Sequence, residues 1–424
     1  MSEQPTYDVA IVGASLSGCA AAILFGRQGL KVALIERETD TDAYKKICTH
    51  LIQSSATPTL KRLGLVEPIE AAGGVRQVLE ISTPWGWIRD PGEPRDRPAY
   101  GYNLRREKLD PLVRAKAAAT AGVDFMPGQS VRELVMENGR AVGVRTSSQQ
   151  GSGRTIRARL VVAADGRNSA VAQLSGAKSK THANGRFTYS AYYADMPMPK
   201  QSTAQIYFLN PNWASVLRTD DGLVMLGAMP TNDQLPQWKG HVEEEFLKYF
   251  DGIPDAPSPR LGRRVSPFLG MLKMPMITRP PVHAGIAFIG DASFTADPLW
   301  GVGCGFAFQT AEWLFDNVRP AFEGKLEMAR ALKAYAGQHK KRLGGHEFVM
   351  KDYLSGRRYN GIETLMNSAG ARDPACASHI VAFGSRNSSL MQFMAPGAIA
   401  RAVWVNTRHA FGMSTSGARP VQQP

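Results

Sequence analysis

"VGASLSGCAAAILFGRQGLKVALIERE", from Val12 to Glu38, carries the strongest indication of how this chain folds. A short apolar run leads into Gly13, which is typical of a buried parallel strand. Apolar residues then recur at helical spacing up to Gly29, which is placed to end the helix in the left-handed conformation. A second apolar run covers Lys31–Glu36. This succession predicts a βαβ unit and therefore an α/β fold built on a parallel sheet.

The turn at the start of this helix is a candidate nucleotide site. Gly13 permits a tight turn, and Gly18 lets the helix pack close to the strand. The helix N-terminus offers free N–H groups and a positive dipole end to a pyrophosphate. Ser15 replaces the middle glycine of the usual pattern, and its small side chain carries a hydroxyl that can donate to a phosphate oxygen. The predicted contacts of this turn are Gly13, Ser15, Leu16, Ser17 and Gly18.

Glu36 ends the second predicted strand, and its carboxylate can accept hydrogen bonds from both hydroxyls of a ribose. A 2′-phosphate would be repelled there, so NADP is disfavoured at this site. Arg37, the next residue, is included among the predicted cofactor contacts.

Two later segments repeat the combination of a strand and a glycine turn. Asp165 in RLVVAADGRNSAV and Asp291 in GIAFIGDASF each stand at the end of an apolar run. An aspartate held there can accept hydrogen bonds from sugar or ribityl hydroxyls. Pro298, Gly301 and Gly303 follow the second motif, and then a helical run begins, whose N-terminus would face an anion or an electron-rich ring.

Together these motifs resemble those of the FAD-dependent aromatic hydroxylases, flavoprotein monooxygenases of the p-hydroxybenzoate hydroxylase type, over roughly residues 5 to 340. The resemblance implies FAD as the cofactor. It places Glu36 on the adenosine ribose, Asp165 in the D-G role near flavin and pyridine nucleotide, and Asp291 on the ribityl chain. Arg106, in NLRREKLDPLV, fits the family's R-x-x-L-D pattern, in which the arginine contacts the cofactor. Pro298 and the glycine loop that follows would border the flavin ring.

Several residues depart from the family's pattern. Besides Ser15, Phe294 stands where a histidine is usual and Gly305 where an asparagine is usual. An arginine that often contacts the flavin is replaced by the segment YKKICTH, in which Lys45, Lys46 or the backbone of residues 48–50 would substitute.

The rest of the chain predicts two further parts. Residues 130–146 alternate apolar and polar residues around an Asn-Gly pair, which indicates a hairpin and adds a β-meander to the first domain. Residues 181–275 contain four strand-like runs and then QLPQWKGHVEEEFLKYF, which predicts one amphipathic helix. The expected architecture is a Rossmann-like FAD-binding domain with an inserted antiparallel-sheet substrate domain and a helical C-terminal region. The boundaries are 5–80, 100–180 and 276–344 for the first, 81–99 and 181–275 for the second, 345–412 for the helical region and 413–424 for a flexible tail.

Composition narrows the class of protein. The four cysteines form no C-x-x-C pair, so neither a disulfide framework nor a metal site is indicated. No basic run alternates with aromatic residues, which argues against nucleic acid as a partner. No apolar run reaches the ~18 residues of a membrane span, and acidic Glu3 stands where a secretion signal would be basic, so a cytoplasmic protein is expected. The net charge of +13 fits a basic surface or the attraction of an anion: a pyridine nucleotide, an acidic substrate or an acidic carrier protein.

The resemblance to the aromatic hydroxylases implies an FAD-dependent monooxygenase. In that chemistry a flavin hydroperoxide, kept in a dry pocket, hydroxylates or epoxidises an aromatic, polycyclic or unsaturated small molecule. Since the chain has one complete nucleotide turn, NAD(P)H would dock transiently or a separate flavin reductase would supply electrons. His50 is the candidate catalytic residue, with a helix-start or surface histidine as the alternative. A monomer and a homodimer are both compatible with the sequence.

Three other functions stay open. The segment KKIC is similar to the early segment of FAD-dependent alkene reductases, and WGWIRDP partly matches the tryptophan motif of flavin-dependent halogenases, without its second tryptophan and Ile-Pro end. A flavin-free binding protein with a degraded motif is the non-enzyme alternative, which Ser15 suggests and which intact Glu36, Asp165 and Asp291 argue against.

Overall fold

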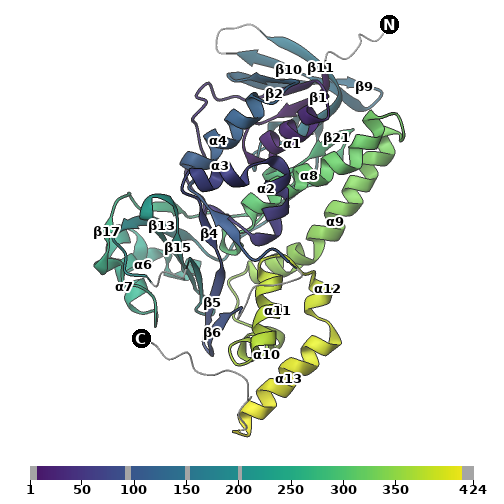
Figure 1. Cartoon of the computed structure of the whole chain (residues 1–424). Helices are drawn as coiled ribbons and strands as arrows, with labels where there is room; N and C mark the ends of the chain where they lie inside the picture. The colour runs from purple at the N-terminus through teal and green to yellow at the C-terminus, as the bar shows by residue number, and fades with distance from the viewer. Residues whose placement is uncertain (1–6, 91–96, 149–152, 199–202, 413–424) are drawn as a thin grey trace.

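The structure, a computed structural model, describes residues 7–90, 97–148, 153–198 and 203–412. Its first sheet carries the nucleotide turn (Figure 1). The parallel strands of this sheet are β8 (Val123–Met126), β2 (Val32–Ile35), β1 (Tyr7–Val12), β11 (Arg154–Ala163) and β21 (Ile286–Phe288), in that spatial order. The predicted α/β fold with a parallel sheet is therefore confirmed.

A β-meander continues this sheet. β9 (Gln129–Glu137) and β10 (Arg140–Ser148) pair antiparallel on either side of the Asn138-Gly139 turn, and β10 pairs antiparallel with β11. β20 (Val282–His283) adds a short antiparallel strand beyond β21. The hairpin prediction is confirmed.

Helices cover the first sheet. α1 (Leu16–Arg27) is buried from Leu16 to Gly26 because it packs against the sheet and against α8 (Gly303–Phe322). It ends before Gly29, whose φ of 80° only glycine adopts readily. The other helices of this part are α2 (Thr57–Leu63), α3 (Val66–Ala71), α4 (Arg106–Ala118) and α5 (Ala170–Ser175). One small sheet has the strand order β3 (Leu51–Ile52), β7 (Gly101–Asn103) and β4 (Val75–Gln77). A second has the order β12 (Lys180–His182), β19 (Met276–Thr278) and β22 (Phe294–Thr295).

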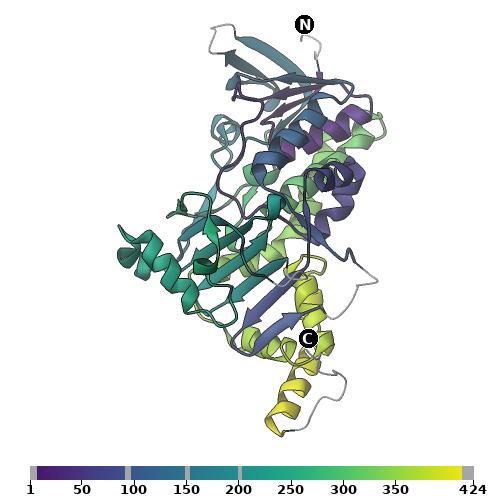
Figure 2. The ribbon, with the colours of Figure 1, turned by 60° about the vertical axis from the view of Figure 1, so that its left-hand side comes forward.

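A second large sheet occupies the region for which a substrate domain was predicted (Figure 2). The four strands predicted in this region are confirmed as β13 (Thr188–Ala194), β14 (Ala204–Phe208), β15 (Trp213–Arg218) and β16 (Val224–Met229), all antiparallel to their neighbours among these four. β5 (Leu79–Thr83) joins β14 in parallel, and β6 (Gly86–Arg89), β17 (Arg263–Arg264) and β18 (Leu269–Met271) complete the sheet.

The helix expected in this domain is divided. α6 (Leu235–Trp238) and α7 (Val242–Asp251) replace the single helix that the pattern predicted. The chain leaves helical geometry at Lys239, whose ψ is 118°, and Gly240 has a φ of 81°, so a right-handed helix cannot continue through this pair. Trp238, Phe246 and Phe250 from the two helices pack in one core with the sheet.

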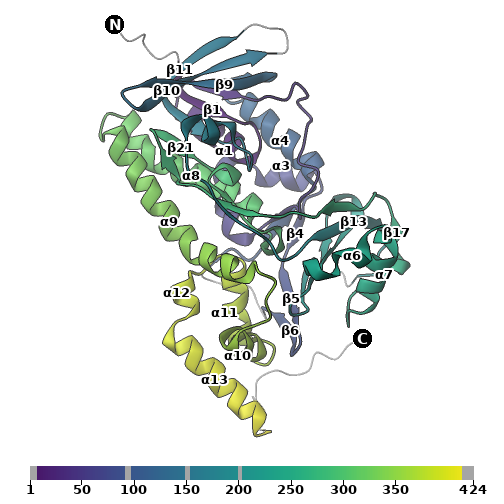
Figure 3. The ribbon, with the colours of Figure 1, turned by 180° about the vertical axis from the view of Figure 1, so that it is seen from behind.

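The C-terminal region is helical, as predicted, but it has no break at residue 345. α9 (Met328–Tyr353) runs uninterrupted from the first sheet to the C-terminal helices (Figure 3). These are α10 (Gly361–Gly370), α11 (Pro374–Gly384), α12 (Leu390–Phe393) and α13 (Pro396–Ala410), of which α10, α11 and α13 share a core with Ile81 and Ile88 of the second sheet. In the part of the chain that the structure describes, none of the helices has both the length and the apolar character needed to span a membrane. The predicted tail, 413–424, and Glu3 lie outside the described residues.

Candidate functional site

Two adjoining cavities form a groove at the carboxyl ends of the parallel strands. One reaches Glu36, the other reaches Asp291, and both are lined by Ser15 and Lys45. All the predicted cofactor residues line this groove except Gly18: Gly13, Ser15, Leu16, Ser17, Glu36, Arg37, Arg106, Asp165, Asp291, Pro298, Gly301 and Gly303. The fold thus brings the three sequence motifs to one extended depression, although their individual roles remain predictions.

The glycine turn packs closely against the backbone around it, which requires glycine at two positions. Gly13 has a φ of +103°, and a Cβ added at Gly18 would lie 1.8 Å from the carbonyl oxygen of Gly13. Gly18 therefore acts beneath the groove, by letting α1 approach β1. The carboxylate of Glu36 accepts hydrogen bonds from the backbone N–H of Ala14 at 2.7 Å and of Glu38 at 3.1 Å, which fixes it beside the turn.

Ser15 is engaged by Arg106. The Arg106 guanidinium donates to the Ser15 hydroxyl at 3.0 Å and to the two carboxylate oxygens of buried Asp110 at 2.5 and 2.9 Å. Burial opposes the charged form of Arg106, but the neighbouring Asp110 carboxylate keeps the pKa of the guanidinium above its ordinary value. The groove therefore carries a permanent positive charge next to the turn.

Lys45 supplies a second positive charge. It belongs to the segment YKKICTH, in which the family's arginine is missing. Its ammonium pairs with Asp291 at 3.1 Å, and the Asp291 carboxylate raises the pKa of Lys45. Arg37 and Arg167 also line the groove. The cavity that reaches Asp291 thus has four cationic side chains and the carboxylates of Asp165, Asp291 and Asp297 in its lining, and its cations can contact an anionic ligand such as a pyrophosphate.

The carboxylate of Asp165 is hydrogen-bonded to other groups of the protein. It accepts hydrogen bonds from the Ser169 hydroxyl at 2.6 Å and from the backbone N–H of Val171 at 3.0 Å. Burial raises the pKa of this carboxyl. In this structure Asp165 therefore orders the start of α5 while it lines the groove.

The far end of the groove is built by a short 3₁₀ turn, Pro298–Trp300. Asp297 is buried and accepts a hydrogen bond from the backbone N–H of Leu299 at 3.1 Å, which fixes the turn. Gly301 follows with a φ of +60°, and α8 begins at Gly303. The N-terminus of this 20-residue helix lines the groove and presents free N–H groups to an electron-rich group.

His50 lies behind the groove rather than among its lining residues. Its Nδ1 accepts the backbone N–H of Arg106 at 3.0 Å, so Nε2 carries the proton and faces the Tyr192 hydroxyl. Burial lowers the pKa of His50, which keeps the ring neutral. His50 also has a left-handed φ of 59°, and the neighbouring Thr49 is the residue that lines the groove. These contacts suit a residue that joins α4 to the second sheet.

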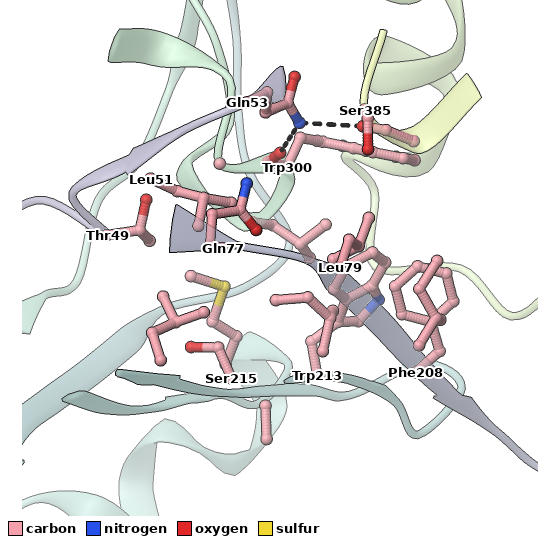
Figure 4. Close-up of a pocket in the computed structure, with 18 residues that line it drawn as sticks. Thr49, Leu51, Gln53, Gln77, Leu79, Phe208, Trp213, Ser215, Trp300 and Ser385 are labelled. Atoms are coloured by element: carbon pink, nitrogen blue, oxygen red, sulfur yellow. Dashed lines mark hydrogen bonds between the residues drawn. The ribbon is translucent and has the colours of Figure 1, made fainter. Parts of the chain in front are cut away.

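A third cavity lies next to the groove, against the second sheet (Figure 4). Its volume is about 50 Å³, and it shares Thr49 and Gly301 with the groove. Its lining residues are all uncharged, and the aromatic ones are Phe208, Trp213 and Trp300. The Oε1 atom of buried Gln77 has no hydrogen-bond partner.

Sequence reasoning missed most of this cavity. Gln53 ties its walls together by donating to the carbonyl oxygens of Trp300 at 3.1 Å and Gly384 at 2.9 Å (Figure 4). The only available signal was the aromatic character of the strands that carry Phe208 and Trp213. No local pattern connects residues 49–53 with Gly384 and Ser385, which close the cavity from the C-terminal region.

Comparison with known proteins gives three kinds of match. The family model described as an FAD binding domain matches residues 6–244. The chain is 25% identical over 346 residues to a digeranylgeranylglycerophospholipid reductase of Methanocella arvoryzae, covering 80% of this chain and 84% of the relative. It is 23% identical over 344 residues to a 1H-pyrrole-2-carbonyl-[peptidyl-carrier protein] brominase of Pseudoalteromonas luteoviolacea, covering 76% and 80%.

Among solved structures, the p-nitrophenol 4-monooxygenase PnpA of Pseudomonas putida DLL-E4 superimposes with a TM-score of 0.75 at 18% identity, over 91% of this chain and 99% of the other. This likeness establishes a common fold for the whole body of the molecule.

Proposed function

Because this chain belongs to the FAD-binding domain family and takes FAD as its cofactor, we propose that it is a monooxygenase acting on an uncharged, largely apolar small molecule. It is a flavin-dependent oxidoreductase related to the aromatic hydroxylases, as its motifs predicted. The observation that supports the proposal is that the cofactor groove and the uncharged cavity lie side by side and share Thr49 and Gly301 as lining residues.

We place an extended dinucleotide along the groove in the orientation that its lining residues support. Glu36 would hold the adenosine ribose, the turn at Gly13–Gly18 the pyrophosphate, and Lys45 with Asp291 the ribityl chain. The flavin ring would then lie between residues 298–303 and Thr49, beside the third cavity. Reduced FAD activates dioxygen, and transfer of one oxygen atom to a substrate succeeds where water is kept out.

The cavity favours a substrate without charge. A carboxylate moved into it would lose its hydration and meet no cation among the lining residues, which is a cost of several kcal/mol. The unpartnered Oε1 of Gln77 needs a hydrogen-bond donor, so the substrate would carry a hydroxyl or N–H group beside an aromatic or unsaturated body. The positive charge of the protein would then serve the cofactor and its electron donor, NAD(P)H or a separate flavin reductase, rather than the substrate.

Alkene reduction is the second candidate, because the relative in Methanocella arvoryzae is named a reductase. Halogenation has less support from this chain. Trp85 stacks on Tyr359 and Trp87 packs against Tyr207, so the partial tryptophan motif belongs to the β5–β6 hairpin, and neither residue is among those that line the three cavities. Pro91 of that motif lies outside the described residues.

The test uses the FAD-loaded protein with NADH, NADPH or a chemically reduced flavin supply. Neutral phenols, anilines and indoles are screened for stimulated oxidation of the nicotinamide, and products are analysed after reaction under ¹⁸O₂. Incorporation of one labelled oxygen atom supports the proposal. Turnover of an alkene without dioxygen would instead establish the reductase.

A further inference from the structure

Two cysteines from distant parts of the chain meet in the cofactor groove. Cys48 lies in the loop before β3, and Cys304 is the second residue of α8. They are 256 residues apart in sequence, yet their Sγ atoms are 3.7 Å apart, and both residues line the groove. Both cysteines are free thiols.

The surroundings make the two sulfurs chemically different. The Cys48 Sγ accepts the backbone N–H of His50 at 3.3 Å and lies 3.9 Å from a guanidinium nitrogen of Arg106. The Cys304 thiol, together with the positive charge of Arg106, holds the pKa of Cys48 well below its ordinary value. The same contact and burial raise the pKa of Cys304 well above its ordinary value. Cys48 is therefore the better nucleophile of the pair, because the His50 N–H and the Arg106 guanidinium both stabilise its thiolate form.

We propose that Cys48 and Cys304 form a disulfide when hydrogen peroxide reaches the groove. The Cys48 thiolate attacks one peroxide oxygen, the O–O bond breaks, and the products are a Cys48 sulfenic acid and hydroxide. The Cys304 sulfur then displaces the sulfenic oxygen, which leaves as water with the thiol proton, and the S–S bond forms. Two sulfurs lose two electrons in total, and peroxide is reduced to the level of water. A dithiol or a reducing thiol partner restores the pair.

The two cysteines lie in the groove that is proposed to hold the flavin, so their oxidation is expected to affect FAD binding. A reduced flavin that meets dioxygen without a substrate releases hydrogen peroxide, so the oxidant arises beside these sulfurs. Bond formation brings the sulfurs from 3.7 Å to about 2 Å. The bond would fix the Cys48 loop to the start of α8 in the wall of the groove. Oxidised protein is therefore expected to hold FAD with a different affinity from reduced protein.

The remaining two cysteines provide an internal control. Cys19 is buried in α1 and Cys376 in α11. Burial raises the pKa of Cys19, and burial together with Asp373 raises the pKa of Cys376 to about 11. Both are therefore protonated thiols of low reactivity toward peroxide.

The experiment treats FAD-loaded protein with a small excess of hydrogen peroxide. Thiols are then counted under denaturing conditions, the intact mass is measured and the cysteine peptides are mapped. The expected result is a fall from four thiols to two, a loss of two hydrogen masses and a Cys48–Cys304 peptide that a dithiol reductant cleaves. FAD retention is measured in parallel by flavin fluorescence.

Matched variants separate this reaction from general oxidation. Cys376→Ser is expected to lose the same two thiols as the natural protein. Cys304→Ser is expected to lose only the Cys48 thiol, with oxygen atoms added to its mass, and Cys48→Ser to lose none. The proposal is overturned if peroxide leaves all four thiols intact in the natural protein, consumes Cys19 or Cys376 first, or adds oxygen to Cys48 while Cys304 stays free.

Discussion

The Arg106 guanidinium donates a hydrogen bond to the Ser15 hydroxyl at 3.0 Å, so an arginine 91 positions later in the chain holds the residue that interrupts the glycine pattern. Ser15 makes no cap hydrogen bond to its own helix. The serine therefore connects the turn to α4, where a glycine would leave the Arg106 nitrogen without this partner. This connection explains how the altered turn keeps the shape of a nucleotide site.

Ser15→Ala tests that connection. The variant loses one hydrogen bond to a charged donor, so we expect FAD to bind roughly tenfold more weakly, about 1.5 kcal/mol. A titration of the protein without cofactor, followed by quenching of flavin fluorescence, measures the change. Ser175→Ala, a serine at the end of α5 and outside the groove, is the control. Equal affinity in Ser15→Ala and the natural protein would contradict a role of the hydroxyl.

Gly18→Ala is expected to abolish FAD binding. Its Cβ would lie 1.8 Å from the Gly13 carbonyl oxygen, so α1 must move away from β1 and the turn must deform. Gly29→Ala is the matched control: it has a φ of +80° but nothing within 4 Å of the added Cβ. That variant should cost about 1 kcal/mol through backbone strain alone and keep its FAD. Flavin content after gel filtration distinguishes the two, and a yellow Gly18→Ala protein would refute the packing argument.

Gln77→Leu is expected to change substrate preference. The natural cavity offers a buried acceptor, so a phenol should bind more tightly than its methyl ether, by about 1 to 3 kcal/mol. Leucine removes the acceptor and keeps the wall apolar, which should erase the difference. Dissociation constants come from the shift of the flavin spectrum, independently of turnover. If the natural protein and Gln77→Leu show the same difference in affinity between the phenol and its methyl ether, Gln77 does not form a hydrogen bond with the substrate.

Acid is expected to destabilise the protein through two histidines of α9. Burial lowers the pKa of His339 to about 4 and, with Arg386, the pKa of His346 to about 4. Because the folded pKa lies below the unfolded value of about 6.5, the stability is complete above pH 6.5 and declines as the pH falls to 4. Each histidine accounts for ~3 kcal/mol over that range. Urea unfolding between pH 7 and 4 should show a shallower decline for His339→Gln; an unchanged slope would exclude His339 as a cause.

Much of the fold follows from the sequence because its signals are local. The strand before Gly13, the Asn138-Gly139 turn and the alternating strands of the second sheet each depend on a few neighbouring residues. The predicted helix from Gln234 onward was wrong in one detail, since its apolar spacing outweighed the single glycine at position 240.

The site follows from the sequence only in part. The three motifs lie along the groove because the carboxyl ends of parallel strands meet at one edge. The contact between Cys48 and Cys304 and the position of His50 behind Thr49 depend on tertiary packing, which no spacing in the chain encodes. The sequence predicted that Lys45 is one possible substitute for the family's arginine, but it did not predict that Lys45 pairs with Asp291.

The walls of the third cavity come from the loop at Thr49, strand β5 at Leu79, strand β15 at Trp213 and the end of α11 at Gly384. The shape of this cavity therefore depends on several segments of the chain at once. A chimera that exchanged the antiparallel sheet alone would combine cavity walls from two different proteins. Transfer of the substrate preference would require exchange of the C-terminal helices together with the sheet.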